Sequence, residues 1–418
     1  MKVVVQKFGG TCVESEANQL LTAERIMEAK DRGIHPVVVV SAMGRQGQPY
    51  STAEFVSMVR RIHPDIQPRE LDLLMSCGEI ISTVAMAHLL RSKGYETVAL
   101  SGGQAGLITD HYFGHAHIVR IEPHHLLAAL QDGYMVFVAG FQGITERHEI
   151  TTLGAGGSDY TAVALTHVIQ QTPTLPFGEE LEVEPLQMFK EVDGIMTADP
   201  TTLDQDEDGG PRTIRHLTHD ECVAMSRLGS QVLQQQAAEM ARKHRSPLIV
   251  RNFREAASPG TEVGSQPPTV SDRATAIVDR SRLLVFDLAS GDARLPQQIE
   301  ERLGGERLTY YQVHTEAPES RFAVLPLKYR DMEAIVRHVL AARGVSAEIN
   351  ADDFALVSVV GEALRQRRDD WDDQARKVLS DCGVPIHGTS RDAISLSYLV
   401  PEDQRRKAVK FLHHSLVL

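Results

Sequence analysis

The sequence is short of cysteine and of aromatic side chains. It has four cysteines and one tryptophan among 418 residues, and aromatic residues make up 5% of the chain. Cys12, Cys77, Cys222 and Cys382 lie far apart, and no two of them have the Cys-x-x-Cys spacing. This distribution argues against a zinc site and against a disulfide framework, and it indicates a reducing compartment.

Positive charge is also in deficit. There are 43 lysine and arginine residues against 56 acidic ones, so the formal net charge at pH 7 is −13. A negative surplus argues against nucleic acid or an anionic membrane as the main partner. It leaves ATP possible as a ligand, because a local basic site can lie within an acidic protein.

Long apolar runs are missing as well. No apolar stretch approaches the ~18 residues of a membrane span, and the first residues lack the apolar run of a secretory signal peptide. The chain is 42% hydrophobic and 24% charged, which is ordinary for globular proteins, and its length indicates about two or three domains. We therefore expect a cytoplasmic protein with no membrane or nucleic-acid partner.

The first strand that the sequence predicts leads into a glycine corner. Val3, Val4 and Val5 form a β-branched run that is typical of a buried strand, and Lys7 precedes Gly9-Gly10-Thr11. Two glycines let the backbone turn tightly and bring its N–H groups near an anion such as phosphate. Lys7 would add a positive charge. A plain strand–turn–helix with a surface lysine explains the same residues and stays open here.

Other predicted strands end in the same way. Apolar strands over 37–40, 97–100 and 135–139 are followed by Ser41, Ser101 and Gly140. A second glycine-rich loop spans 151–159 and precedes a helix predicted over 160–170. Ligands of open parallel sheets bind beyond the carboxyl ends of the strands, so we expect these ends to converge on one crevice.

The remaining pattern divides the chain. Helices are predicted over 17–31, 71–91, 218–228 and 231–243, and 204–210 is predicted to be a surface loop. A first domain is predicted over 1–255, a Pro- and Gly-rich linker over 256–275 and two small α+β units over 276–418. In that last part the predicted strands are 283–288, 322–327, 354–360 and 393–400, and the helices are 295–303, 330–342, 371–382 and 402–412.

Five motifs in order carry a family resemblance. They are Lys7-Phe8-Gly9-Gly10-Thr11, Met75-Ser76-Cys77-Gly78-Glu79, Gly140-Phe141-Gln142-Gly143, Gly156-Gly157-Ser158-Asp159 and the run from Val192 to Pro200. With them the chain resembles the aspartokinases of the single-function bacterial type, which carry a C-terminal pair of ACT domains. The resemblance implies an α/β fold, an open and mostly parallel sheet with helices on both faces, followed by two ferredoxin-like ACT domains.

The same resemblance implies phosphoryl transfer from ATP with Mg²⁺ to the β-carboxylate of L-aspartate, an entry step of lysine, threonine and methionine biosynthesis. It implies catalytic roles for Lys7 and Asp159 and no protein metal site. The residues expected at the nucleotide are Lys7, Phe8, Gly9, Gly10, Ser41, Gly156, Gly157, Ser158, Lys190, Glu191, Met196 and Gln231. Those expected at the substrate are Thr52, Glu79, Ala155 and Ser158.

Several of these residues have plainer interpretations. Asp159 can also be interpreted as the N-cap of the helix predicted from Tyr160, and Glu79 as a first-turn carboxylate on a helix dipole. Thr52 and Ser41 are interpretable as a solvated threonine and a turn serine.

The sequence also departs from the family pattern at the expected site. Ala155 stands where the family has an arginine that clamps a substrate carboxylate, and Gln231 where it has a phosphate-binding lysine. Lys190-Glu191 replaces Thr-Asp, and Thr201 replaces another arginine. We expect Lys190 to replace one lost cation from a neighbouring strand end. The alternatives are a catalytically impaired regulatory subunit or amino-acid sensor, and a kinase for a related carboxylate.

The C-terminal part is expected to be regulatory. In the family, paired ACT domains form a subunit interface and bind lysine or threonine as feedback effectors. A homodimer or larger oligomer with an amino-acid effector is therefore implied, and a purely structural, dimerising role for these domains is the alternative.

Overall fold

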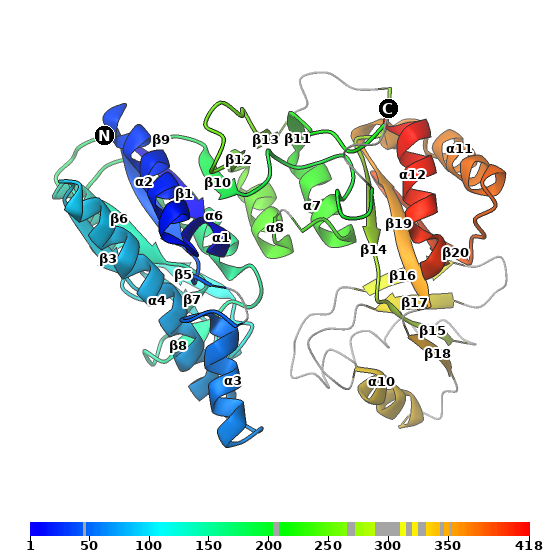
Figure 1. Cartoon of the computed structure of the whole chain (residues 1–418), viewed down its shortest axis with the longest axis horizontal. Coiled ribbons are helices and arrows are strands. Elements are labelled where there is room, and N and C mark those ends of the chain that lie inside the picture. Colours follow the sequence, from blue (N-terminus) through cyan, green and yellow to red (C-terminus); the bar gives the residue numbers. More distant parts are fainter. Residues whose placement is uncertain are drawn as a thin grey trace. The chain divides into compact units, whose positions relative to one another are not determined.

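The computed structural model describes residues 1–44, 47–203, 209–231, 233–265, 272–288, 310–314, 320–324, 332–342, 347–351 and 353–418. The chain forms two compact units (Figure 1). The first comprises Met1–Ile195, Arg215–His219 and Val232–Pro267, and the second Met196–Ile214, Asp220–Gln231 and Pro268–Leu418. The predicted single boundary near 255 is therefore wrong in two places, because two segments from within 1–255 belong to the second unit.

A mostly parallel sheet organises the first unit. Its order is β11-β13-β12-β10-β1-β2-β6-β3, and β9 also pairs with β1. The strands are β1 (Lys2–Phe8), β2 (Ile34–Val40), β3 (Thr97–Leu100), β6 (Met135–Ala139), β9 (Glu182–Val183), β10 (Leu186–Lys190), β11 (His216–Thr218), β12 (Leu248–Asn252) and β13 (Thr261–Gly264). Only the β12–β13 pair is antiparallel, so β1, β2, β6 and β10 all end at one edge of the sheet.

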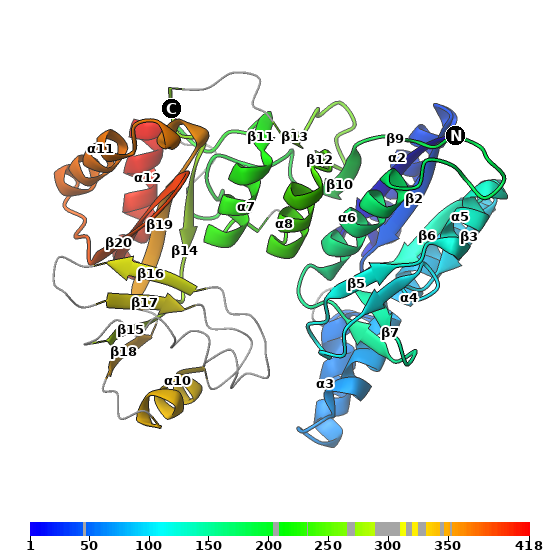
Figure 2. The ribbon, with the colours of Figure 1, turned by 180° about the vertical axis from the view of Figure 1, so that it is seen from behind.

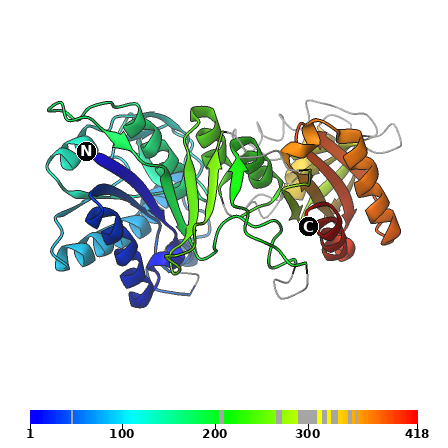
Figure 3. The ribbon, with the colours of Figure 1, turned by 90° about the horizontal axis from the view of Figure 1, so that it is seen from above.

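Helices cover both faces of this sheet (Figure 3). Helices α2 (Glu16–Asp31) and α4 (Pro68–Ser92) pack on one face, and α5 (His124–Gln131) and α6 (Gly157–Gln170) pack on the other, with α8 (Gln235–His244) against α6. Phe8, Ile26, Val38 and Met86 form part of the core under α2 and α4. Because strand side chains alternate, Lys7 lies on the opposite face from Phe8, toward α6.

Helix α4 is long and apolar enough to cross a membrane, whereas the sequence analysis predicted no such stretch. It packs instead against β3, β6 and β8 (Ile150–Thr152) of the first unit. It also carries two buried carboxylates, Asp72 and Glu79. These contacts make it a core helix of this unit.

Three shorter elements complete the surroundings of the sheet edge. Helix α1 (Gly10–Val13) follows β1, and α3 (Thr52–Ile62) precedes α4. A small sheet of order β5-β4-β7-β8 contains β4 (Leu107–Thr109), β5 (Ile118–Ile121) and β7 (Gln142–Thr145) in addition to β8.

The predicted linker is wrong in part. Residues 261–264 form β13, which pairs with β12 and β11. Thr261 and Val263 are buried while Glu262 is exposed, which is the alternation of an ordinary strand. The two flanking glycines made a four-residue strand look like a loop.

The second unit is built on one antiparallel sheet, of order β14-β19-β21-β20-β16-β17-β15-β18. Its strands are β14 (Ala276–Arg280), β15 (Leu284–Leu288), β16 (Tyr310–His314), β17 (Ser320–Val324), β18 (Ala347–Ala351), β19 (Phe354–Val360), β20 (Gly388–Asp392) and β21 (Ser395–Pro401). Its helices are α7 (His219–Leu228), α10 (Met332–Ala341), α11 (Arg368–Asp381) and α12 (Arg405–Leu416), with 3₁₀ turns η1 (Glu362–Arg365) and η2 (Glu402–Gln404). The first residue of α7, His219, is counted with the first unit and the rest of that helix with the second. Helix α10 lies beside β18 (Figure 2).

The sequence predicted two small units in tandem, but the two halves of this sheet are not consecutive in the chain. Strand β14 pairs with β19, and the half containing β15 to β18 is inserted between them. The predicted helix 295–303 and residues 204–208 of the loop predicted over 204–210 lie outside the described residues.

A segment that directly follows the first unit in the chain is anchored in the second. The carbonyl of Thr197 accepts a hydrogen bond from the Ile277 amide at 2.8 Å. The Thr197 hydroxyl lies 2.8 Å from Nε2 of His413. Ala198 and Leu203 contribute to the apolar core of this unit.

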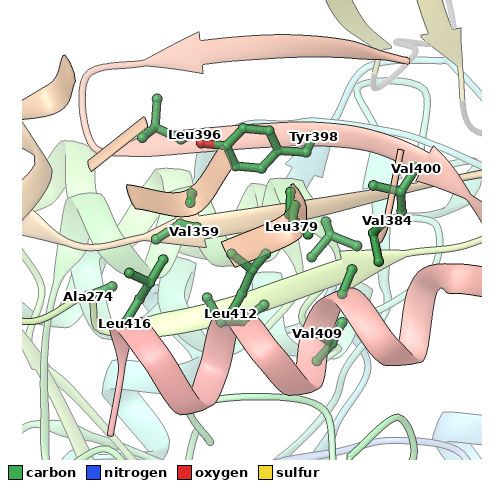
Figure 4. Close-up of a cluster of buried hydrophobic side chains, with 14 of the residues drawn as sticks. Ala274, Val359, Leu379, Val384, Leu396, Tyr398, Val400, Val409, Leu412 and Leu416 are labelled. Atoms are coloured by element: carbon green, nitrogen blue, oxygen red, sulfur yellow. The ribbon is translucent and has the colours of Figure 1, made fainter. Parts of the chain in front are cut away.

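That apolar core lies between the sheet and helices α11 and α12 (Figure 4). Leu412 and Val409 of α12 and Leu379 of α11 are wholly buried against Tyr398. The Tyr398 hydroxyl donates to Oδ1 of Asp372 at 2.8 Å, so its polar end is satisfied inside the core.

Replacing Leu412 by alanine should therefore destabilise the protein by about 2–5 kcal/mol, because it leaves a cavity in a closed core. Urea denaturation followed by circular dichroism measures the loss. The matched control is Phe411→Ala, since the neighbouring Phe411 is 44% exposed and should cost much less. Equal losses from the two variants would contradict this description of the core.

Candidate active site

A buried ion pair marks the edge where the parallel strands end. The ammonium of Lys7, near the end of β1, lies 2.5 Å from Oδ1 of Asp159 in the first turn of α6. Lys7 is 5% exposed and Asp159 is 3% exposed. Two charges held this far from water require a defined partner, and each supplies it to the other.

A second lysine shares the same carboxylate. The ammonium of Lys190, at the end of β10, lies 3.1 Å from Oδ2 of Asp159. Although burial by itself would raise the pKa of Asp159, the positive charges of Lys190 and Lys7 hold it down at about 2. Burial lowers the pKa of Lys190, and repulsion from Lys7 adds to this. The three groups together carry one net positive charge when all are ionised.

Glycine at two corners lets the backbone approach this cluster. A Cβ on Gly10 would lie 2.8 Å from the carbonyl oxygen of Ala42, closer than real Cβ contacts allow. Gly156 has φ +74°, a left-handed backbone conformation that residues with a side chain rarely adopt. Helix α6 starts immediately after it, so the N–H groups of its first turn point toward the same edge.

The helix start decides between two interpretations of Asp159. We predicted a helix from Tyr160 with Asp159 as its possible N-cap, but α6 begins at Gly157 and its N-cap is Gly156. Asp159 is therefore a first-turn residue. Ser158 lies against the end of β6, since a Cβ on Gly140 would come within 2.7 Å of its hydroxyl oxygen.

Glu79 lies in the middle of α4, which rules out the first-turn interpretation of that residue. Its Oε1 accepts a hydrogen bond from the Ala42 amide at 3.1 Å. Its Oε2 is buried and makes no hydrogen bond. Burial raises the pKa of Glu79 to about 8. The Thr52 hydroxyl lies by the preceding residue of the helix, 3.4 Å from where a Cβ on Gly78 would be.

Asp72 was not predicted as part of the site. Its Oδ2 accepts from the amides of Gly114 and Thr152 at 2.8 and 2.7 Å, and its Oδ1 accepts from the Thr152 hydroxyl at 2.8 Å. Asp72 thus fixes the end of β8, just before the second glycine loop. Burial raises its pKa. An acidic residue seven positions before Glu79, on the same side of a largely apolar helix, was the available signal.

Other predicted residues have more limited placements. Phe8 points into the core and stacks on Phe189 at 4.6 Å between ring centroids, so only its backbone faces the corner. The Ser41 amide donates to the Phe8 carbonyl at 3.1 Å. Glu191 and Ala155 are exposed.

The structure assigns two predicted nucleotide residues to the second unit. Met196 and Gln231 both belong to it, so they are not among the residues that the first unit brings together. Residues of the first unit that do gather at this sheet edge are Lys7, Gly9, Gly10, Ser41, Gly156, Gly157, Ser158, Asp159 and Lys190.

Comparisons with known proteins agree with one another. The model of the amino acid kinase family matches residues 2–252. An aspartokinase of Bacillus sp. (strain MGA3) is 32% identical over 100% of this chain and 98% of its own length. One from Geobacillus stearothermophilus is 32% identical with the same coverage.

Solved structures show the same fold. The E. coli aspartokinase III complex with aspartate and ADP (R-state) has a TM-score of 0.77 at 20% identity, covering both chains fully. The aspartate kinase of Clostridium acetobutylicum has a TM-score of 0.69 at 16% identity, over 99% of this chain and all of its own.

The buried Glu79 predicts a pH-dependent stability. Its pKa is about 8 in the folded protein and 4.5 without the environment of the fold, so the native state binds more protons in that window and stability falls as pH rises through it. Glu79→Gln without ligand should match wild type near pH 4.5 and become more stable than wild type toward pH 8. Thermal melts across this range measure the difference.

The control for this series is Glu96→Gln, because the Glu96 side chain is 67% exposed and should give no such trend. A Glu79→Gln variant that gains nothing at pH 8 would show that the carboxylate is not held in an unfavourable charged state.

Proposed function

We propose, since this chain belongs to the aspartokinases of the amino acid kinase family, that Lys7 and the two glycine corners hold the phosphates of ATP while Glu79 holds the aspartate. The family reaction is the ATP-dependent phosphorylation of aspartate. The observation that carries the assignment of residues is the buried cluster of Lys7, Asp159 and Lys190 at the carboxyl edge of the parallel sheet.

The phosphate side fits the chemistry of this transfer. A phosphoryl group in flight spreads negative charge over its oxygens, so catalysis consists of positioning and charge neutralisation. Lys7 supplies a positive charge that Asp159 keeps in place. The amides of Gly9, Gly10 and the first turn of α6 add donors, and the positive end of the α6 dipole faces the same edge.

Magnesium fits this site through the nucleotide. Among the described residues no group of three or more His, Cys, Asp or Glu side chains could hold a metal ion. We propose that Mg²⁺ enters bound to ATP phosphates, where it neutralises charge. The chain's own contribution is then to hold and orient those phosphates.

The substrate side fits an amino acid. The unpartnered Oε2 of Glu79 is a buried acceptor, and the aspartate ammonium would satisfy it and favour the ionised carboxylate. Thr52, whose hydroxyl lies by Gly78, would add a further polar group. Ala155 offers no cation to the substrate's α-carboxylate, so we propose that this chain binds aspartate with fewer charged contacts than its family pattern provides.

We further propose a cytoplasmic location, a homodimer or larger oligomer, and binding of an amino-acid effector by the second unit. Support comes from the resemblance of the chain to aspartokinases with paired ACT domains and from the antiparallel sheet with helices that this unit forms.

Lys7→Met should lower turnover of L-aspartate by about 10²–10³-fold, because it removes a preorganised charge at the phosphates. A hydroxamate assay with ATP and Mg²⁺ traps the acyl phosphate. Lys93→Met is the matched control, since Lys93 is exposed and should keep full activity. Undiminished turnover in folded Lys7→Met would refute the assignment.

Ala155→Arg should raise kcat/KM for L-aspartate by about tenfold, as one added charge-assisted contact to the α-carboxylate would. Ala155→Gln controls for side-chain size without charge. The gain should be absent with a substrate that has no α-carboxylate, such as β-alanine. An equal gain in the glutamine variant would exclude a charge effect.

A further inference from the structure

We infer that Lys190 is a second phosphate-binding cation of this site, and that it works together with Lys7 through the carboxylate they share. This inference rests on the proposed function and deepens it, because it names a residue that contacts the nucleotide phosphates in addition to Lys7.

Strand register explains why the two lysines meet. Lys7 pairs with Met188 across the parallel β1–β10 ladder, so these two side chains point to the same face. Lys190 is two residues after Met188 and therefore points to that face as well. It is the face covered by α6, and Asp159 lies in the first turn of that helix.

The charge balance of the cluster favours an anion. Two ammonium groups contact one carboxylate. The Cys12 thiol is nearby, but burial raises its pKa to about 11, so it stays neutral at pH 7. Glu191, the next residue, is exposed. Lys7, Lys190 and Asp159 by themselves therefore carry one positive charge in excess in a buried place, where an uncompensated charge is costly. A phosphate group would compensate it.

Exposure shows from which side a ligand can approach the cluster. The Asp159 side chain is 4% exposed and that of Lys7 is 6% exposed, whereas that of Lys190 keeps 22%. Lys190 thus forms the open side of the cluster. A lysine there supplies a second cation beside Lys7, from a strand end next to β1.

A purely structural role is the competing explanation. Lys190 would then serve only to offset the charge of buried Asp159, with no contact to the nucleotide. The two explanations predict different ADP affinities for a variant in which Asp159 and Lys190 are both made neutral. In that variant Lys7 alone gives the cluster the same net charge of one as in wild type, but the Lys190 ammonium is absent.

The first measurement is nucleotide affinity by calorimetry for Lys190→Met, Lys190→Arg and the control Lys93→Met. We expect Lys190→Met to weaken binding of ADP with Mg²⁺ by about 10–100-fold, as loss of a hydrogen bond to a charged group does. Adenosine should bind all variants alike, and Lys190→Arg should retain most of the ADP affinity. Wild-type ADP affinity in folded Lys190→Met would overturn the inference.

The second measurement separates contact from neutralisation. If Lys190 touches phosphate, the double variant Asp159→Asn with Lys190→Met stays weak for ADP. Recovery of wild-type affinity in that double variant would overturn the inference in favour of the structural role. Whatever the variants show, phosphorylation of aspartate by the wild-type protein supports the proposed function. A wild-type protein that binds no ADP would overturn both the proposed function and the inference about Lys190.

Discussion

A single buried carboxylate between two lysines is the constraint on which the site depends. Asp159 lies within ion-pair distance of both Lys7 and Lys190, which come from neighbouring parallel strands. In a region with little water this geometry fixes three side chains at once and keeps the carboxylate ionised. It also leaves a net positive charge at the edge where the first glycine corner and the α6 N-terminus supply further donors.

The surroundings of this cluster hold it in register. Asp72 of α4 binds Thr152 at the end of β8 through two hydrogen bonds and the Gly114 amide through a third, so it fixes the start of the second glycine loop. Seven residues later on the same helix, Glu79 binds the amide of Ala42. One core helix therefore positions both the second glycine loop and the buried acceptor Glu79.

Much of this arrangement could be predicted from the sequence, because local patterns determine it. The valine run of β1, the glycine corners and the apolar strands all form where their residues indicate. The sequence predicted a replacement cation at Lys190 but not its contact with Asp159, since the order β10-β1-β2 joins strands far apart in sequence. Non-local pairing also explains why β13 was missed and why the insertion between β14 and β19 was not foreseen. Met196 and Gln231 were predicted in the first domain but belong to the second unit for the same reason.

The departures of this chain from its family pattern change the number and the positions of cations expected at the site. Cations of that pattern are missing at Ala155, Thr201 and Gln231, and one is gained at Lys190. The gained lysine lies on a strand adjacent to β1 and contacts the same carboxylate as Lys7, so we expect it to replace one of the two cations lost from the proposed nucleotide side.

The most direct test is a crystal structure of this chain with ADP and Mg²⁺. The account predicts that the ammonium groups of both Lys7 and Lys190 lie about 2.7–3.2 Å from phosphate oxygens while Asp159 stays between them. A phosphate chain bound elsewhere, with both lysines still paired only to Asp159, would contradict it.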